Sequence, residues 1–522
     1  MSISPFAASR RTVLRAAGAG AVALGLAGCK SAVDEQKSGG AGASGAPKKG
    51  GTLQIGSLTD FTPALLFTQN SFTALHRLVF NTLTAYDKDL KPQPQLAKSW
   101  QVAPDGTSVT FQLREGVKFH SGRPFTADDV VFAINNIKDP KRSAQLRATA
   151  AVVSDITVLS PTELTLKLAH PVSNLFDLFE FLIITDKDSV EDAVAGKKLI
   201  GTGPFVFKGW TPGASLSFTK NPEYFVPDRP YFDGVEIRII PQADSLLAAL
   251  RGKQIQLAVG LSGRDLAPIK SDDQFTIQQY DTGTGAVYVG ANVGVKPLDD
   301  KRVRQAISFA VNRDRILQQA LSGYGLASSA PWPKSSPAYS DATAKRYPYD
   351  PDRAKALLAE AGVPSLDLPL AFLSTAPAIA QMVQFDLQQV GIKTTLEPLD
   401  PAKFQAQLIG QTMPALWTGS HGFAQVHPST LAVSAYPFNE AKNTSKFSDA
   451  RYTEIVQRAW NQVDPDSPVA KAAVQDLSEV LLDQQFVIDL VVLANLYAGT
   501  GNLQGVAQTQ FTDLVLDDAY LA

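Results

Sequence analysis

Apolar residues recur with two different periods along the chain, and these periods predict its secondary structure. In the first half, apolar and polar positions alternate in four runs, which is typical of half-buried strands: 52–58, 108–114, 151–158 and 164–168. Helical spacing predicts one helix over 71–83 and a second that begins at Thr126. Thr126 and Asp129 form a capping-box pattern at that start, because each side chain can bond the other residue's backbone amide.

The second half alternates short helices and strands. Asp350 before a proline predicts a helix start, and Gly362 predicts the end of that helix. A strand over 366–373, a helix over 379–390, a strand over 392–397 and a helix capped by Asp400 follow. This order favours crossover units, so we expect a largely parallel sheet that is covered on both faces.

The N-terminus has the layout of an export signal. Arg10 and Arg11 precede an apolar run over 16–28, which is shorter than the roughly 20 residues that a membrane-spanning helix needs. The segment 1–28 resembles a twin-arginine lipoprotein signal, which implies cleavage before Cys29 and acylation of that cysteine. An ordinary secretory signal with a chance cysteine is the alternative. Residues 29–50, rich in glycine, serine and alanine, predict a flexible linker.

The charge and the motifs of the chain argue against several classes of function. Residues 1–28 hold three arginines and no acid, so the rest of the chain has 45 basic against 50 acidic residues and no long basic run. That balance argues against nucleic-acid binding. We find no nucleophile elbow, P-loop or paired-histidine zinc motif, and His421 and His427 lack a neighbouring third ligand. We therefore expect no enzyme activity, no metal and no cofactor.

One region resembles a known family. The stretch 96–130 contains the segments LAKSW, TFQLREGVKFH and GRPFTADDV, which resemble the signature of the family 5 extracellular solute-binding proteins of ABC importers. Blocks around Gly201, Asn221, Arg302 and Asp350 match in the same order, so the resemblance covers residues 50–520. Most residues of the 96–130 block are of core, turn or capping types, so the block identifies a fold rather than a ligand.

The resemblance implies an α/β, two-lobed periplasmic-binding-protein-like fold (type II, cluster C) with an extra inserted α/β domain. Domain I would comprise 51–87, 202–290 and 490–522, the inserted domain II 88–201, and domain III 291–489. Hinges are expected near Ala291 and near residue 490.

The ligand site departs from the family pattern. Peptide-binding relatives commonly carry an acid three residues after a late tryptophan, and that acid anchors the ligand's amino group. Here Ser420 follows Trp417, and His427 stands where an aspartate would precede proline. Because a buried ammonium without a carboxylate costs several kcal/mol, recognition of free amines is in doubt, unless Asp60 replaces the missing acid. The candidate ligand-binding residues are Asp60, Phe61, Phe67, Trp417, Ser420, His421, Phe423 and Tyr436.

Together these features predict a substrate-binding protein anchored through Cys29 to the outer face of the cytoplasmic membrane. It would capture a peptide-like or oligosaccharide-like solute and deliver it, as a monomer, to ABC permease subunits. An extracytoplasmic sensor or scaffold that uses the same closure is the alternative. A hydrolase would need a nucleophile and base, which the sequence does not reveal.

Overall fold

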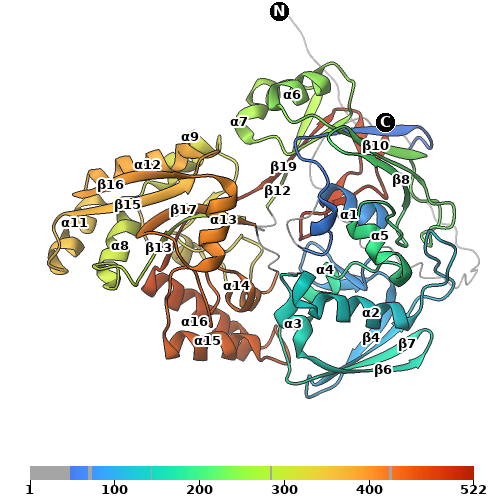
Figure 1. The fold of residues 1–522 in the computed structure, drawn as a ribbon, viewed down its shortest axis with the longest axis horizontal. Coiled ribbons are helices and arrows are strands. Elements are labelled where there is room, and N and C mark those ends of the chain that lie inside the picture. The colour runs from blue at the N-terminus through green and yellow to red at the C-terminus, as the bar shows by residue number, and fades with distance from the viewer. Residues whose placement is uncertain (1–46, 69–72, 143, 282–284, 423–425) are drawn as a thin grey trace, which may run out of the picture. The chain divides into compact units, whose positions relative to one another are not determined.

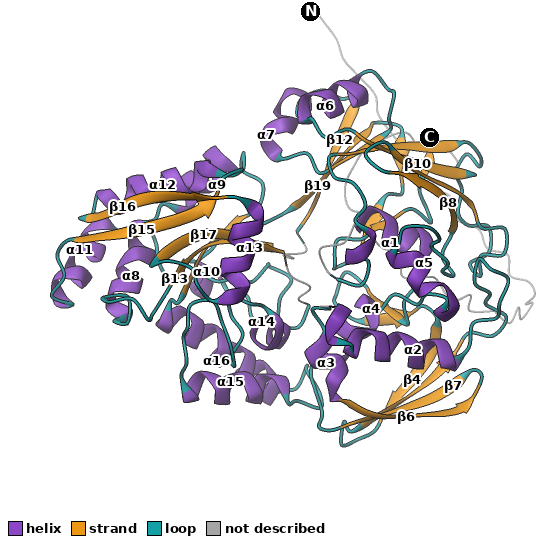
Figure 2. Ribbon diagram, viewed as in Figure 1, coloured by secondary structure: helices purple, strands orange, loops and turns teal. Residues whose placement is uncertain are grey.

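Three sheets of four or more strands organise the described residues of the computed structural model, which are 47–68, 73–142, 144–281, 285–422 and 426–522 (Figures 1 and 2). They belong to one compact unit, Ser38–Ala522. The signal, most of the linker, Cys29 and Phe423 lie outside the described residues. Within them, no helix is both long and apolar enough to cross a membrane.

The first sheet has the order β12-β19-β11-β1-β10-β9-β8. Its strands are β1 (Thr52–Ser57), β8 (Phe205–Thr211), β9 (Ser215–Lys220), β10 (Gly234–Ile239), β11 (Leu257–Val259), β12 (Phe275–Tyr280) and β19 (Asn495–Thr500). β1 is parallel to both neighbours, β10 and β11, and confirms the strand predicted at 52–58. The helices beside this sheet in sequence are α1 (Thr73–Val79), α5 (Val190–Val194), α6 (Ala243–Arg251) and α7 (Gly263–Leu266).

Helix α1 is shorter than the helix predicted over 71–83, of which residues 71 and 72 lie outside the described part. The carbonyl of Val79 accepts a hydrogen bond from Gly203 N at 2.9 Å, and the chain leaves the helix there. A Cβ on Gly201 would lie 2.1 Å from the same oxygen, so this close approach requires glycine.

The inserted domain has an antiparallel sheet of its own, in the order β4-β5-β7-β6. Its elements are β4 (Ala97–Val102), β5 (Ser108–Leu113), β6 (Val153–Ser160), β7 (Glu163–Leu168), α2 (Ala127–Lys138), α3 (Arg147–Val152) and α4 (Leu175–Phe181). The strands predicted at 108–114 and 164–168 are confirmed, whereas the strand predicted at 151–158 begins at Val153, because helix α3 continues to Val152. At the start of α2 the Asp129 carboxylate accepts from Thr126 N at 2.9 Å, which confirms the capping box.

The second large sheet has the order β14-β18-β13-β17-β15-β16. Its strands are β13 (Gly285–Ala291), β14 (Leu326–Ala327), β15 (Leu366–Leu373), β16 (Ile392–Leu399), β17 (Leu416–Gly422) and β18 (Val487–Val492). The expectation of a largely parallel sheet is wrong, because only the β15–β16 and β15–β17 pairs are parallel. β13 enters from the first sheet and β18 leaves for it, and both run antiparallel to their neighbours.

The helices of this part follow the predicted caps. Asp350 accepts from Arg353 N at 2.8 Å, Gly362 has a φ of 74°, and Asp400 accepts from Lys403 N at 2.9 Å. The helices are α8 (Lys301–Ala310), α9 (Arg313–Ala320), α10 (Asp341–Ala344), α11 (Pro351–Glu360), α12 (Pro377–Gln388), α13 (Pro401–Gly410), α14 (Pro428–Ser434), α15 (Ala450–Trp460) and α16 (Pro468–Gln484).

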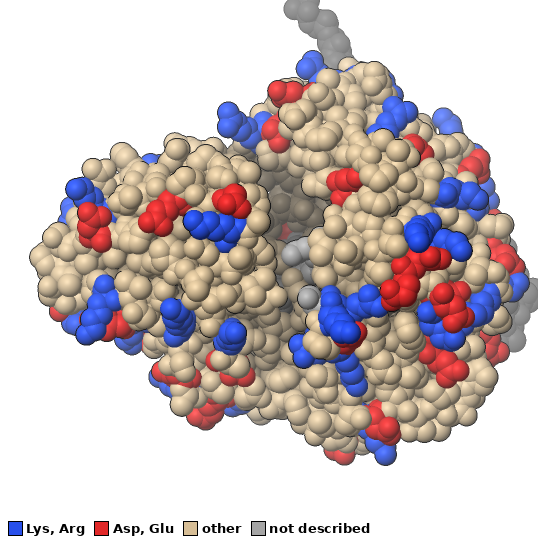
Figure 3. All heavy atoms as spheres, in the orientation of Figure 1, with Lys and Arg blue, Asp and Glu red and all other residues tan. Residues whose placement is uncertain are grey.

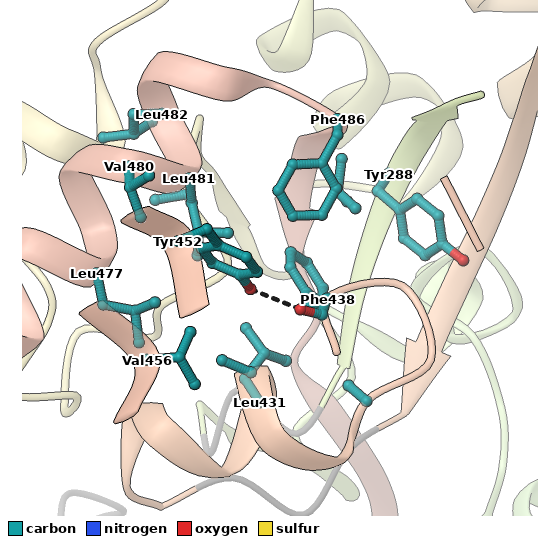
Figure 4. Close-up of a cluster of buried hydrophobic side chains, with 14 of the residues drawn as sticks. Tyr288, Leu431, Phe438, Tyr452, Val456, Leu477, Val480, Leu481, Leu482 and Phe486 are labelled. Atoms are coloured by element: carbon teal, nitrogen blue, oxygen red, sulfur yellow. Dashed lines mark hydrogen bonds between the residues drawn. The ribbon is translucent and has the colours of Figure 1, made fainter. Parts of the chain in front are cut away.

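The core between this sheet and its C-terminal helices is built on buried aromatic and aliphatic side chains (Figure 4). In it, the Tyr452 hydroxyl donates a hydrogen bond to the Phe438 carbonyl at 2.5 Å, so the one polar atom of this buried ring is paired. Phe486 stacks on Phe447 with ring centroids 4.4 Å apart. This core fixes α14, α15 and α16 against the sheet that carries the candidate site.

Candidate functional site

The chain crosses between the two large sheets twice, and the crossings lie side by side. β12 ends at Tyr280 in the first sheet and β13 begins at Gly285 in the second. On the return, β18 ends at Val492 and β19 begins at Asn495, which pairs with Tyr280. Leu493 N donates to Gly285 O at 2.8 Å, which links the two crossings.

These crossings correct the predicted boundaries. Residues 285–290 and 490–492 were expected in domain I, but both segments are strands of the second sheet. Ala291, near which a hinge was expected, ends β13, where it pairs with Leu416 on one side and its N–H donates to Phe486 O at 3.1 Å on the other. The segments that join the sheets therefore lie between Tyr280 and Gly285 and between Val492 and Asn495, where the backbone leaves one sheet for the other.

Around these crossings the molecular surface is indented. The face in Figure 3 is hollowed between the part that carries α13 and the part that carries α1 and α5, whose places Figure 1 gives. Acidic and basic side chains are interspersed on this face, without a continuous patch of either sign. A hollow beside paired strand crossings is the geometry of a ligand cleft that opens and closes by rotation.

Three protein donors bind the Asp60 carboxylate. Its Oδ1 accepts hydrogen bonds from Trp210 Nε1 at 2.9 Å and from Phe61 N at 2.7 Å, and its Oδ2 accepts from Gly213 N at 2.7 Å. Phe61 is buried and meets the Trp210 ring edge-on, with centroids 5.6 Å apart. Asp60 thus joins the loop after β1 to strand β8 and its turn, a role that fully accounts for a half-buried acid.

Phe67 is buried too. Its ring lies 5.6 Å from the Arg142 guanidinium carbon, and Phe67 lines a pocket between the loop after β1, α2 and the C-terminal segment. The same pocket is lined by His76 and Asp513, whose Nδ1 and Oδ1 atoms are 2.9 Å apart. Phe61 and Phe67 both belong to the core of the first sheet, so neither offers a broad aromatic surface.

Trp417 lies on β17 and has no exposed surface. Its ring covers Gly290 of β13, where an added Cβ would be only 2.1 Å from the indole. Tyr288 lies two residues away on β13 and covers Gly419 of β17 in the same manner. The two glycines therefore make room for two buried aromatic rings, and Trp417 supports the site strand from within the core.

Ser420, His421 and Tyr436 have more open positions. Ser420 is exposed on β17, His421 is half-buried on the same strand, and Tyr436 is 40% exposed after α14. Burial lowers the pKa of His421 to about 4, so its imidazole is neutral at neutral pH. The side chains that the sequence predicted at the end of β17 therefore supply a hydroxyl and a neutral ring, but no charge.

His427 occupies the helix-capping position that the resemblance assigns to an aspartate. Its Nδ1 accepts from Ser429 N at 3.3 Å at the start of α14, and burial lowers its pKa to about 4. Within the described residues, no group of three or more histidine, cysteine or acidic side chains is placed to hold a metal ion.

Sequence reasoning missed one buried acid beside the site strands. Asp489 lies on β18 directly opposite Tyr288, and burial raises its pKa well above the usual range although Arg313 opposes that shift. The signal was visible, because Asp489 interrupts an otherwise apolar run, Val487–Val492. An aspartate inside an apolar strand is expected to be buried, which is rare for an acid without a partner.

Comparisons with known proteins agree with this architecture. The model of the bacterial extracellular solute-binding proteins, family 5 Middle, matches residues 91–443. Di/tripeptide-binding protein 1 of Pseudomonas aeruginosa is 29% identical over 78% of this chain and 82% of its own length. Heme-binding protein A of Haemophilus influenzae is 27% identical over 76% and 79%.

Among solved structures, DppA of Helicobacter pylori in complex with the peptide STSA superimposes with a TM-score of 0.75 at 23% identity, over 90% of this chain and 99% of that one. This likeness confirms the two-lobed α/β fold, with the strand crossings between its lobes. The similar proteins are named as binding proteins, and the family match covers well over half of the sequence. The chain belongs to the family 5 bacterial extracellular solute-binding proteins.

Proposed function

We propose that this chain is the lipid-anchored solute receptor of an ABC importer, and that its solute lacks a free cationic amine. A peptide with a blocked N-terminus, or an oligosaccharide, fits this description. The solute would lie between the two lobes and be delivered to permease subunits when the lobes close. Only a solute that contacts both lobes favours closure, because a conformational equilibrium shifts only through differential binding.

The observation that carries the proposal is that neither expected anchor offers a carboxylate without protein donors of its own. The position three residues after Trp417 is Ser420, and Asp60 on the other lobe already accepts three hydrogen bonds. An ammonium group transferred from water into a closed cleft loses several kcal/mol of hydration unless a carboxylate replaces it. Relatives that bind peptides and heme support a family site that accepts different chemistries.

The test compares how tightly matched ligands bind to a form of the protein that begins at Ser38. Calorimetric titration with free tripeptides, the same tripeptides N-acetylated, and short oligosaccharides would measure affinity directly. We expect one of the two classes without an ammonium group to bind, and we expect each free tripeptide to bind at least about 100-fold more weakly than its acetylated form. Equal affinity for a free and an acetylated tripeptide would contradict the proposal.

A single substitution sharpens this test. Ser420 is exposed, so Ser420→Asp restores the acid at little cost in stability. We expect Ser420→Asp to narrow the preference for acetylated over free tripeptides by at least about tenfold, because the new carboxylate pairs with the ammonium. Thr412→Asp, at another exposed residue before β17, is the matched control and should leave the preference unchanged.

The anchor is tested separately. Metabolic labelling with a fatty acid should mark the wild-type protein and leave Cys29→Ala unlabelled, since Cys29 is the single cysteine of the chain. Label on the Cys29→Ala variant would reject the anchor and leave the binding proposal standing.

A further inference from the structure

The inserted domain touches the second lobe through a buried polar contact that no part of the binding proposal uses. Asp177, in the first turn of α4, accepts from Thr430 Oγ1 at 2.6 Å and from His427 N at 3.1 Å, both at the start of α14. Tyr86 Oη donates to the other oxygen of Asp177 at 2.9 Å. Asp177 and Thr430 have no exposed surface, so these bonds are shielded from water.

The residues just before α4 extend this contact to the end of α15. Ser173 N donates to Trp460 O at 2.8 Å, and Trp460 Nε1 donates to Asn174 Oδ1 at 2.7 Å. Asn174 Nδ2 in turn donates to Thr430 Oγ1 at 3.0 Å. We call Ser173, Asn174 and Asp177 with His427, Thr430 and Trp460 the α4–α14 contact.

Trp460 makes this contact more than a set of hydrogen bonds. Its ring packs against the core of the inserted domain and also against the core of the second lobe, and it meets the His170 ring edge-on at 5.3 Å. Separating α4 from α14 would expose part of this ring to water and leave the buried donors and acceptors of the contact without their partners. The contact is therefore built to persist while the lobes move.

The second lobe is thus held at two places. One is the pair of strand crossings, where Leu493 N bonds Gly285 O. The other is the α4–α14 contact. In Figure 1 the crossings lie near the labels β12 and β19, at the upper end of the gap between the ribbons, whereas α14 lies beside α3 at its lower end. A body held at two separate points has one rotation left, about the line that joins them.

We propose that the α4–α14 contact is a second joint of the clamp, so that the second lobe rotates about the line from the strand crossings to this contact. The inserted domain supplies the joint and thereby restricts opening and closing to one direction. This inference rests on the proposed binding of a solute between the lobes.

A disulfide across the contact tests whether it stays intact. Ser173 Oγ and Ser429 Oγ are 3.2 Å apart, so Ser173→Cys with Ser429→Cys places two thiols within reach of each other. The chain from Ser38 has no other cysteine. We expect the oxidised and reduced forms to bind an N-acetylated tripeptide that binds wild type with affinities within about twofold, and to contract equally in small-angle scattering. A tenfold loss on oxidation that a reductant reverses would overturn the joint.

Weakening the contact gives the complementary result. Asn174→Ala with Thr430→Val removes hydrogen bonds of the contact and spares the strand crossings. We expect broader distances between spin labels at Lys197→Cys and Lys403→Cys, two exposed sites on different lobes. Thr343→Val, at a buried threonine of the second lobe away from the contact, should leave the distribution unchanged. An unchanged distribution in the double variant would reject the joint.

The two proposals fail in different ways. If neither wild type nor any variant binds acetylated peptides or oligosaccharides, the binding proposal fails, and the spin-label distances without ligand still test the joint. If wild type binds but the oxidised cysteine pair does not, the joint alone is wrong.

Discussion

Replacing Asp60 separates a structural role from a ligand-binding one. In Asp60→Ala, Trp210 Nε1, Phe61 N and Gly213 N all lose their acceptor. At about 1 kcal/mol for each hydrogen bond, the free energy of unfolding should fall by about 3 kcal/mol. Asp60→Asn keeps an oxygen for Trp210 and Phe61 but not a second acceptor for Gly213, so we expect a loss of about 1 kcal/mol.

The assay is urea unfolding of the chain from Ser38, followed by tryptophan fluorescence and circular dichroism. Asp273→Ala, at an exposed acid on the turn before β12, is the matched control and should change the unfolding free energy by less than about 0.5 kcal/mol. Solute affinity of the folded Asp60→Asn variant should equal that of wild type. Wild-type stability of Asp60→Ala, combined with a loss of solute affinity, would refute this reasoning and return Asp60 to the ligand site.

Three further predictions concern buried groups. Gly290→Ala should lower the unfolding free energy by about 2 kcal/mol in urea, because the new Cβ meets the Trp417 indole, whereas Gly209→Ala, with its nearest atom 4.0 Å away, should be tolerated. Arg313 donates to the carbonyls of four residues, so Arg313→Lys should cost about 2 kcal/mol and lower the melting temperature, and an unchanged temperature would contradict its role. Burial raises the pKa of Asp177 to about 6. Between pH 4 and 6 the Asp177 carboxyl therefore stays protonated in the folded state but loses its proton in the unfolded chain. As the pH rises from 4 to 6, the unfolding free energy of wild type should fall by up to about 3 kcal/mol relative to that of Asp177→Asn. Parallel curves of unfolding free energy against pH for the two proteins would exclude this titration.

Local sequence was sufficient for much of the secondary structure and for the family. The strand over 366–373 and the helix starts at Asp350 and Asp400 match the structure, because strand alternation and helix caps depend on residues within four positions of each other. The sequence alone also showed that no acid stands three residues after Trp417.

The remaining features depend on residues that lie far apart in the chain. Asp60 meets Trp210 across 150 positions, and Asp177 meets His427 across 250, so no local pattern reveals that either carboxylate is occupied. Trp417 is buried because Gly290 on another strand makes room for its ring. The direction of β13 and β18 follows from where the chain crosses between sheets. The sequence by itself determined the elements and the missing charge. The tertiary structure decided which side chains remain free, because hydrogen bonding and burial depend on which distant segments pack together.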